Sequence, residues 1–142
     1  MSSPPRTNHE QIPLNLYRVS RPGFARAISN VRLTPTTHDD VRHIVLDLDA
    51  LDYHFLEGQS LGVLTPGTDG KGHANKLRLY SIASTRLGDD RRGRSASICV
   101  KRVIYRDPAT GEERHGVASN FLCDLAPTYR GCENIIITGG RP

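Results

Sequence analysis

Short runs of alternating or β-branched apolar residues, separated by turn residues, dominate the pattern of this chain. Such runs are typical of half-buried strands, because successive side chains of a strand point to opposite faces of a sheet. Turn signals such as Pro66-Gly67 and Gly88-Asp89-Asp90 separate the runs. We therefore expect an antiparallel barrel or sandwich. The predicted strands are Ala25–Leu33, Val41–Leu48, Ser60–Leu64, Leu77–Ser81, Ser95–Val103 and Asn134–Thr138.

One short helix is predicted near the end of the chain. The run Ser119–Leu125 combines a Ser or Asn cap with apolar residues and stops before Pro127. At the other end, residues 1–20 contain Pro4, Pro5 and Pro13 and few apolar pairs. We expect an N-terminal extension over residues 1–20 and a single domain over residues 21–142.

Composition and charge narrow the possible classes. At 142 residues the chain has the length of one domain and can bury a core without disulfide or metal support. Its three cysteines form no CxxC pair, so we expect reduced thiols and a cytoplasmic location. No run is apolar enough for a membrane span or the core of a signal peptide. The net charge of +4 favours anionic ligands or an acidic protein partner.

The strongest local motif is the predicted strand in Lys76–Ser84. Strand alternation places Arg78, Tyr80 and Ile82 on one face. A guanidinium can bind a phosphate through two hydrogen bonds, and a nearby tyrosine ring can stack on a planar heterocycle. The motif therefore suits a flat, phosphorylated cofactor, although on physical grounds alone a half-buried strand with an exposed arginine and a core tyrosine is the favoured interpretation.

Two further segments bear on the same ligand. Gly116–Asn120 precedes or opens the helix, where unpaired backbone amides favour an anion such as a pyrophosphate. A glycine turn followed by a serine cap is the simpler interpretation. The strand Cys99–Tyr105 ends in a tyrosine next to a turn, so Tyr105 is a candidate to stack on a second ring.

Together these segments resemble the plant-type ferredoxin–NADP reductases. The resemblance covers Leu14–Thr138, the whole of that family's FAD domain, and implies an all-β fold: a six-stranded antiparallel Greek-key β-barrel with one short helix. Parts of the chain also resemble the reductase component of benzoyl-CoA epoxidase, a relative in the same flavoprotein family. The four blocks that carry the main resemblance, in the family's order and spacing, are Glu57–Val63, Lys76–Thr85, Cys99–Tyr105 and Gly116–Leu125.

The resemblance also implies roles for single residues. Arg78 binds the FAD pyrophosphate, and Tyr80 stacks on the isoalloxazine ring. The hydroxyl of Ser81 lies near flavin N5, which makes Ser81 the candidate catalytic residue. Tyr105 stacks on the adenine. The remaining residues expected to line or close the cofactor site are Leu79, Cys99, Lys101, Gly116, Val117, Ala118 and Ser119.

Reductases of this family move electrons between NADPH and a one-electron carrier through FAD. The resemblance therefore implies FAD as cofactor and a ferredoxin or flavodoxin-like acidic carrier as partner. The family's nicotinamide-binding domain has no counterpart in the sequence, so NADP(H) is expected only through a missing or separate domain. Ala118 replaces the family's usual cysteine, and Thr138-Gly139-Gly140-Arg141-Pro142 replaces a Thr-Gly-Pro-Val-Gly run.

Two other function classes stay open at this point. One is a non-catalytic module that has the barrel fold and docks a partner, which failure to retain FAD would favour. The other is a nucleic-acid-binding barrel, whose aromatic side chains stack on bases. The sequence argues against nucleic acid because its five tyrosines and three phenylalanines do not cluster.

Three weaker signals receive simpler interpretations. The loop Gly67–His73 is rich in glycine but lacks the spacing of a phosphate-binding P-loop, so it predicts a hairpin turn. The six histidines show no metal-ligand spacing, so no metal is expected. The run Arg86–Arg94 is more simply a solvated loop than a surface that steers an acidic carrier. The oligomeric state stays open.

Overall fold

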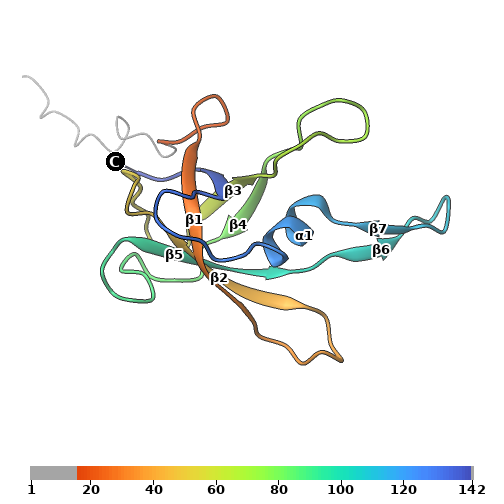
Figure 1. The fold of residues 1–142 in the computed structure, drawn as a ribbon, viewed down its shortest axis with the longest axis horizontal. Helices are drawn as coiled ribbons and strands as arrows, with labels where there is room; N and C mark the ends of the chain where they lie inside the picture. Colours follow the sequence, from red (N-terminus) through yellow and green to blue (C-terminus); the bar gives the residue numbers. More distant parts are fainter. Residues whose placement is uncertain (1–15, 142) are drawn as a thin grey trace, which may run out of the picture.

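The computed structural model describes residues 16–141, which form eight strands and one short helix (Figure 1). Pro4, Pro5 and Pro13 of the predicted extension, and Pro142, lie outside the described residues. All strand pairings within the described part are antiparallel. The elements are β1 (Gly23–Arg32), β2 (Val41–Asp47), β3 (Ser60–Leu64), β4 (Arg78–Ser81), β5 (Ser95–Lys101), β6 (Ile104–Arg106), β7 (Glu113–His115), α1 (Val117–Cys123) and β8 (Ile135–Thr138).

Six strands form the main sheet in the order β4-β3-β8-β1-β2-β5. The last strand, β8, pairs with both β1 and β3, so the chain returns between two earlier strands in the manner of a Greek key. The two edge strands meet again through a bridge between Ile82 and Ile98, next to a hydrogen bond of 2.7 Å from the Ala83 amide to the Ser97 carbonyl. The predicted antiparallel β-barrel with one short helix is confirmed.

Most buried residues of the core come from the strands, with Leu122 added by α1, whereas the predicted strand Leu77–Ser81 contributes only the partly buried Tyr80. β2 pairs with β5 from Val41 opposite Lys101 to Asp47 opposite Ser95 without a shift in register. Full burial of each large aliphatic side chain contributes about 1.5–3 kcal/mol, so this core supplies most of the driving force for the fold. The largest fully buried apolar side chains are Ile44, Leu46, Leu61, Ile98, Leu122, Ile135, Ile137, Val63 and Val100.

The segment before Arg21 lies against the barrel where it is described. Tyr17 pairs with Gly139 through the backbone and stacks on the buried Tyr53 ring, with the ring centroids 5.9 Å apart. The Tyr53 hydroxyl donates a hydrogen bond of 3.0 Å to the Thr138 carbonyl. Tyr17 therefore packs against the barrel next to the C-terminal end of β8.

The strand prediction over Ser95–Val103 ran too far, and a small hairpin was missed. β5 ends at Lys101, and β6 with β7 forms a separate two-stranded ribbon that projects from the barrel (Figure 1). All residues of both ribbon strands are exposed. A ribbon without a buried face lacks the apolar alternation that reveals a strand in a sequence.

The helix begins earlier than predicted. α1 spans Val117–Cys123 instead of Ser119–Leu125, and its N-cap is Gly116, which has no side chain to bind the first turn. The expected Ser cap is wrong because the Ser119 hydroxyl instead accepts a hydrogen bond of 3.0 Å from the Val103 amide. No helix within residues 16–141 is long and apolar enough to cross a membrane.

Candidate functional site

A cavity of about 220 Å³ lies between the start of α1 and the loop that leads into β4. The cavity is lined by Arg78 of β4 and by Val117 and Ala118 of α1. The three residues therefore lie close enough to contact one ligand, as predicted from the sequence. The other lining residues are Thr65, Asp69, Asn75 and Lys76.

The charges around this cavity favour an anion. Lys76 and Arg78 stand two positions apart, and both are exposed. The first backbone N–H groups of a helix lack intrahelical partners and carry the positive end of its dipole. The one acidic residue of the lining, Asp69, already accepts hydrogen bonds from the Lys71 and His73 amides at 2.9 and 3.0 Å. The cavity therefore combines two cations and backbone donors with one carboxylate, which is already hydrogen-bonded within its own loop.

The loop beside the cavity is held by Asn75. Its side-chain amide donates to the carbonyls of Thr65 and Pro66 at 3.3 and 3.0 Å. Sequence reasoning missed Thr65, Asn75 and Lys76 as lining residues. Lys76 carried a usable signal, because it precedes the predicted strand by one residue and shares the strand face of Arg78.

Tyr80 and Ser81 complete β4. Tyr80 is half-buried against the core, and burial raises the pKa of its hydroxyl, with neighbouring Cys123 adding to the shift and Arg78 opposing it. Cys123 belongs to α1, so the Tyr80 side chain lies near the helix as well as beside Arg78. Ser81 is exposed at the end of the strand, opposite Ser60.

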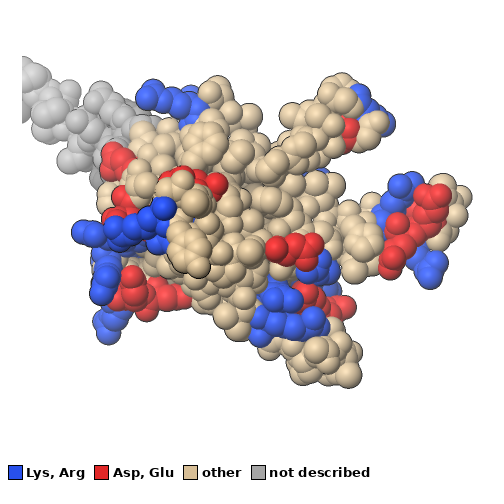
Figure 2. All heavy atoms as spheres, viewed as in Figure 1, with Lys and Arg blue, Asp and Glu red and all other residues tan. Residues whose placement is uncertain are grey.

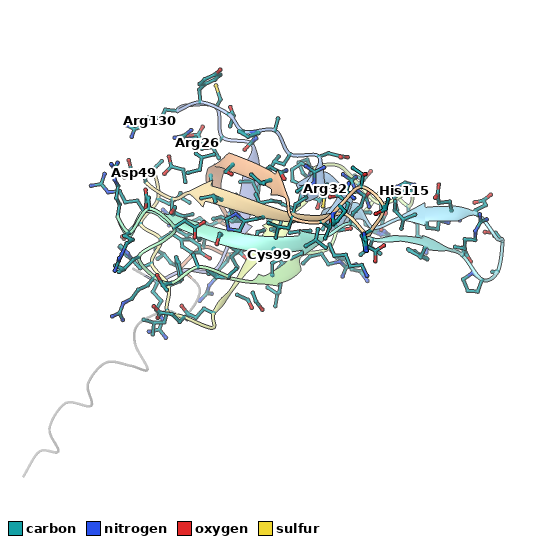
Figure 3. All side chains as sticks on the ribbon, turned by 90° about the horizontal axis from the view of Figure 1, so that it is seen from below. Arg26, Arg32, Asp49, Cys99, His115 and Arg130 are labelled. Atoms are coloured by element: carbon teal, nitrogen blue, oxygen red, sulfur yellow. The ribbon has the colours of Figure 1, made fainter. Side chains whose placement is uncertain are left out.

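Cys99 and Lys101 lie on β5, away from the lining of the cavity. Figure 3 shows Cys99 near the middle of the molecule, with Arg26 to its left and Arg32 to its right. Cys99 is exposed, and Lys101 forms an ion pair of 3.2 Å with Asp39. Lys101 instead lines a separate polar hollow of about 560 Å³ beside the loop between β1 and β2.

Tyr105 sits on the projecting β6–β7 hairpin, opposite Arg114, and is 53% exposed. Its ring contacts neither the cavity lining nor Tyr80 in a described interaction within residues 16–141. The hairpin begins beside α1, because the Gly116 amide donates to the Val103 carbonyl at 2.8 Å. Tyr105 therefore lies apart from Tyr80, the residue predicted to stack on the isoalloxazine ring. Such a separation suits an elongated ligand that has a ring at each end.

Gly116 and Ser119 shape the approach to the helix. A Cβ atom on Gly116 would meet the Ser119 hydroxyl at 2.8 Å and the Val103 side chain at 3.0 Å, so a larger residue does not fit here. The Ser119 hydroxyl is bound to the Val103 amide inside the fold. Its backbone amide, rather than its hydroxyl, remains for the predicted contact with an anion.

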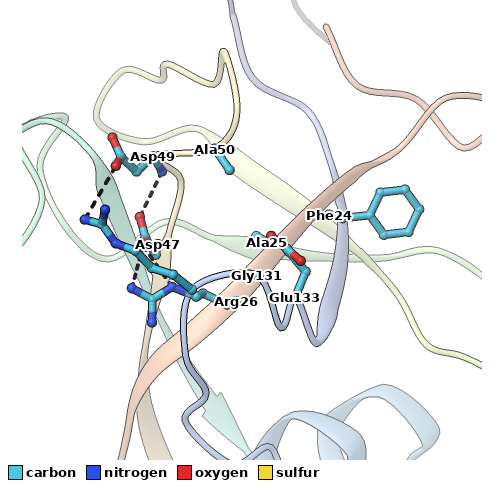
Figure 4. A pocket seen from close by; sticks show the side chains of 9 residues that line it. Phe24, Ala25, Arg26, Asp47, Asp49, Ala50, Gly131 and Glu133 are labelled. Carbon is cyan, nitrogen blue, oxygen red and sulfur yellow. Dashed lines mark hydrogen bonds and ion pairs between the residues drawn. The ribbon is translucent and has the colours of Figure 1, made fainter.

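A hollow of about 190 Å³ at the far end of the barrel has different chemistry (Figure 4). Arg26 binds Asp47 there at 2.8 Å, and Arg130 lies 3.9 Å from Asp49. Because its cations are matched by carboxylates, this hollow is a poor anion site. Within the described residues no group of three His, Cys, Asp or Glu side chains is placed to hold a metal ion.

The surface charges are mixed in sign. On the face seen in Figure 2, Lys and Arg stand beside Asp and Glu at the ends of the barrel and along the hairpin. Nucleic-acid-binding surfaces are typically basic stripes, so this arrangement does not favour that function. The loop Arg86–Arg94 lies at the end of the barrel opposite the hairpin (Figure 1).

Comparison with known proteins shows what this chain is similar to. No protein-family model matches it. It is 41% identical over 136 residues to a ferredoxin–NADP reductase of Picosynechococcus sp., covering 95% of this chain and 33% of the relative. It is 46% identical over 126 residues to the chloroplastic embryo isozyme of ferredoxin–NADP reductase from Oryza sativa subsp. japonica, covering 84% of this chain and 32% of the relative.

Solved structures agree on the fold. Ferredoxin–NADP+ reductase from Plasmodium falciparum matches with a TM-score of 0.65 and 22% identity, over 91% of this chain and 42% of that one. The same enzyme with 2'P-AMP matches with a TM-score of 0.64. The chain is therefore homologous to ferredoxin–NADP reductases over most of its own length, and the solved structures agree on its fold. It spans about a third of the length of the curated relatives that it matches.

Proposed function

We propose that this chain is the FAD-binding domain of a ferredoxin–NADP reductase-like oxidoreductase, which moves electrons between NADPH and a one-electron carrier. The observation that supports this most directly is the cavity that joins Arg78 to Val117 and Ala118. These residues come from two blocks that the resemblance assigns to the pyrophosphate of one cofactor. Two cations and the unpaired amides of a helix start fit a pyrophosphate.

Each part of FAD has a matching group in this proposal. Arg78, with Lys76 beside it, holds the pyrophosphate against the amides of Val117–Ser119. Tyr80 stacks on the isoalloxazine, and Tyr105 on the hairpin stacks on the adenine. Leu79, Cys99, Lys101 and Gly116 stay in the proposal as further residues of the FAD site, with Cys99 and Lys101 outside the cavity that takes the pyrophosphate.

Ser81 is the proposed catalytic residue. It is exposed at the end of β4, directly after Tyr80, so its hydroxyl can donate a hydrogen bond at the edge of a ring stacked on that tyrosine. When bound, FAD supplies the conversion between a two-electron hydride and single electrons. The protein orients the ring and excludes water from the face that Tyr80 covers.

The proposed partner is an acidic carrier such as ferredoxin or a flavodoxin-like protein. Val117, which lines the cavity, is 57% exposed, and Leu79, next to Arg78, is 69% exposed. These exposed apolar side chains are available to a partner surface, and the net charge of +4 favours an acidic one. NADP(H) binding is assigned to the part of the relatives that this chain does not match. A cytoplasmic location stays a prediction.

FAD retention tests the proposal. The purified chain is mixed with a slight excess of FAD, separated from unbound cofactor and examined by visible spectroscopy and circular dichroism. We expect about one FAD per chain with a shifted flavin spectrum. A chain that is folded by circular dichroism but retains no FAD would contradict the proposal and favour a docking module.

A further inference from the structure

Arg102 lies between β5 and β6 and binds side chains from two separate parts of the fold. Its Nε atom donates to Oδ2 of Asp40 at 3.1 Å, at the end of the loop between β1 and β2. Its two other guanidinium nitrogens donate to Oδ1 of Asn120 at 3.0 Å and to Oδ1 of Asp124 at 2.7 Å. We call Arg102 and these three partners the Arg102 clamp.

Asn120 connects the Arg102 clamp to the start of α1 through hydrogen bonds. The side-chain nitrogen Nδ2 of Asn120 donates to the Val103 carbonyl at 2.9 Å and to the Gly116 carbonyl at 2.7 Å. The side-chain oxygen Oδ1 of Asn120 accepts from Arg102. The Gly116 amide and the Ser119 hydroxyl also bind the Val103 backbone, at 2.8 and 3.0 Å. Val103 is therefore fixed against the first turn of the helix from several directions.

Two predicted ligand contacts flank this fixed point. Val117 and Ala118 follow Gly116 and line the cavity with Arg78. Tyr105 follows Val103 by two residues on the hairpin. In contrast, Tyr80 and Ser81 stand on β4, which has no hydrogen bond to the clamp residues in the described structure. The clamp thus connects the elements assigned to the pyrophosphate and the adenine, and not the strand assigned to the flavin ring.

We propose that Arg102 is a positioning residue that sets the helix start against the hairpin and so makes the site select FAD over flavins without a pyrophosphate. This inference rests on the proposed function. The guanidinium side chain is 18% exposed, so its charge-assisted hydrogen bonds are only partly screened by water. A glutamine at this position cannot reach all three partners.

The chain offers a matched control in Arg26. Its side chain is also 18% exposed, binds Asp47 at 2.8 Å and donates to the Thr128 carbonyl at 2.7 Å. In Figure 3 Arg26 lies well apart from Arg32, which forms an ion pair of 3.7 Å with Asp40 of the clamp. A variant at Arg26 therefore removes a comparable ion pair without touching the clamp.

The folded state should survive the substitution at Arg102. Asp40 keeps the Arg42 guanidinium at 2.7 Å, and the Asp124 side chain is 68% exposed and can be hydrated. Circular dichroism and thermal unfolding of Arg102→Gln and Arg26→Gln establish that both variants are folded before any ligand is added.

The test compares FAD with riboflavin, which has the same ring but no pyrophosphate or adenine. Fluorescence titrations are made with the wild-type chain, Arg102→Gln and Arg26→Gln. We expect Arg102→Gln to raise the Kd for FAD about tenfold, a change of about 1.4 kcal/mol, and to leave the Kd for riboflavin unchanged. Arg26→Gln should preserve the ratio of the two Kd values. An unchanged ratio in Arg102→Gln, or an equal loss in both variants, overturns the inference.

Amide hydrogen exchange of the ligand-free chains separates this inference from the proposed function. Arg102→Gln should speed the exchange of the Gly116 and Asn120 amides, which bind the carbonyls of Val103 and Gly116, and Arg26→Gln should not. Unchanged exchange in Arg102→Gln, beside a wild-type chain that binds FAD, overturns the clamp alone. A wild-type chain that binds no FAD overturns the proposed function and the flavin selectivity with it.

Discussion

Arg78 on β4 and Ala118 on α1 line the same cavity, although one belongs to a sheet edge and the other to the single described helix of residues 16–141. The fold brings them together because Tyr80 of β4 packs against the same core that contains Leu122 and Cys123 of α1. A ligand that contacts both β4 and α1 in this cavity lies beside the cations Lys76 and Arg78, so a negatively charged group suits it.

Replacing Arg78 tests the charge of that ligand. Arg78→Ala should raise the Kd for FAD about tenfold to a hundredfold, because a charge-assisted hydrogen bond contributes about 1.5–3 kcal/mol. The Kd for riboflavin should not change, since riboflavin has no phosphate. Fluorescence titration measures both. Arg130→Ala is the control, because Arg130 is 83% exposed and lies at the other end of the barrel (Figure 3). An equal increase in the Kd for FAD in both variants would contradict the assignment of Arg78 to the pyrophosphate site.

Replacing Tyr80 tests the stacking of the flavin ring. Tyr80→Ala should weaken the binding of both FAD and riboflavin by about threefold to tenfold, since aromatic stacking contributes about 0.5–1.5 kcal/mol beyond buried area. Tyr80→Phe keeps the ring and should bind like the wild type. Flavin fluorescence quenching reports the contact, and Tyr129→Ala, at an 84% exposed loop position, is the control. Full quenching in Tyr80→Ala would contradict the assignment.

Thiol labelling distinguishes the three cysteines. Cys99 and Cys132 are exposed, whereas Cys123 is buried, and burial raises the pKa of its thiol and keeps it protonated. N-ethylmaleimide should label the two exposed cysteines of the folded chain and reach Cys123 only after unfolding. Added FAD should slow the labelling of Cys99 and leave that of Cys132 unchanged. Peptide mass spectrometry checks this, and equal rates at Cys99 with and without FAD would place it outside the site.

The stability of the chain should depend on pH through Asp40. Hydrogen bonds from Arg42 and then Arg102 lower the pKa of this carboxyl below its ordinary value, against the opposing effect of partial burial. A lowered pKa in the folded state stabilises the fold above the ordinary value of about 4, and this contribution is lost as the pH falls through the folded value. The difference in unfolding free energy between wild type and Asp40→Asn should thus be largest near neutral pH and shrink in acid.

Urea unfolding at neutral pH and below about pH 4 measures this difference. Asp39→Asn serves as control, because its carboxylate is 73% exposed and its ion pair with Lys101 should contribute less than about 1 kcal/mol. A difference for Asp40→Asn that stays constant with pH would contradict the account of this carboxylate.

The sequence predicted the parts of the fold that have a buried face. β2 and β5 carry apolar residues that point into the core, so their positions follow from the pattern. The block around Arg78 and Tyr80 was also identifiable, because it combines a cation, an aromatic ring and strand alternation within a few residues. These features depend only on local sequence.

The features that the sequence did not predict depend on contacts between distant segments. The β6–β7 hairpin has no buried face, so nothing in its residues distinguishes it from a loop. The helix starts at Val117 after the N-cap Gly116, and the Ser119 hydroxyl binds the Val103 amide, a partner that only the folded chain supplies. The role of Arg102 likewise requires three partners from two separate segments.

Hydrogen exchange of the whole chain with and without FAD tests the central claim most directly, because it asks where the cofactor binds. We expect FAD to protect residues 76–82, 103–105 and 116–120, which carry the proposed ring, adenine and pyrophosphate contacts. Residues 84–94 and 126–134, at the other end of the barrel, should exchange at the same rate. Protection confined to those remote segments, or no protection in a folded chain at saturating FAD, would contradict the account.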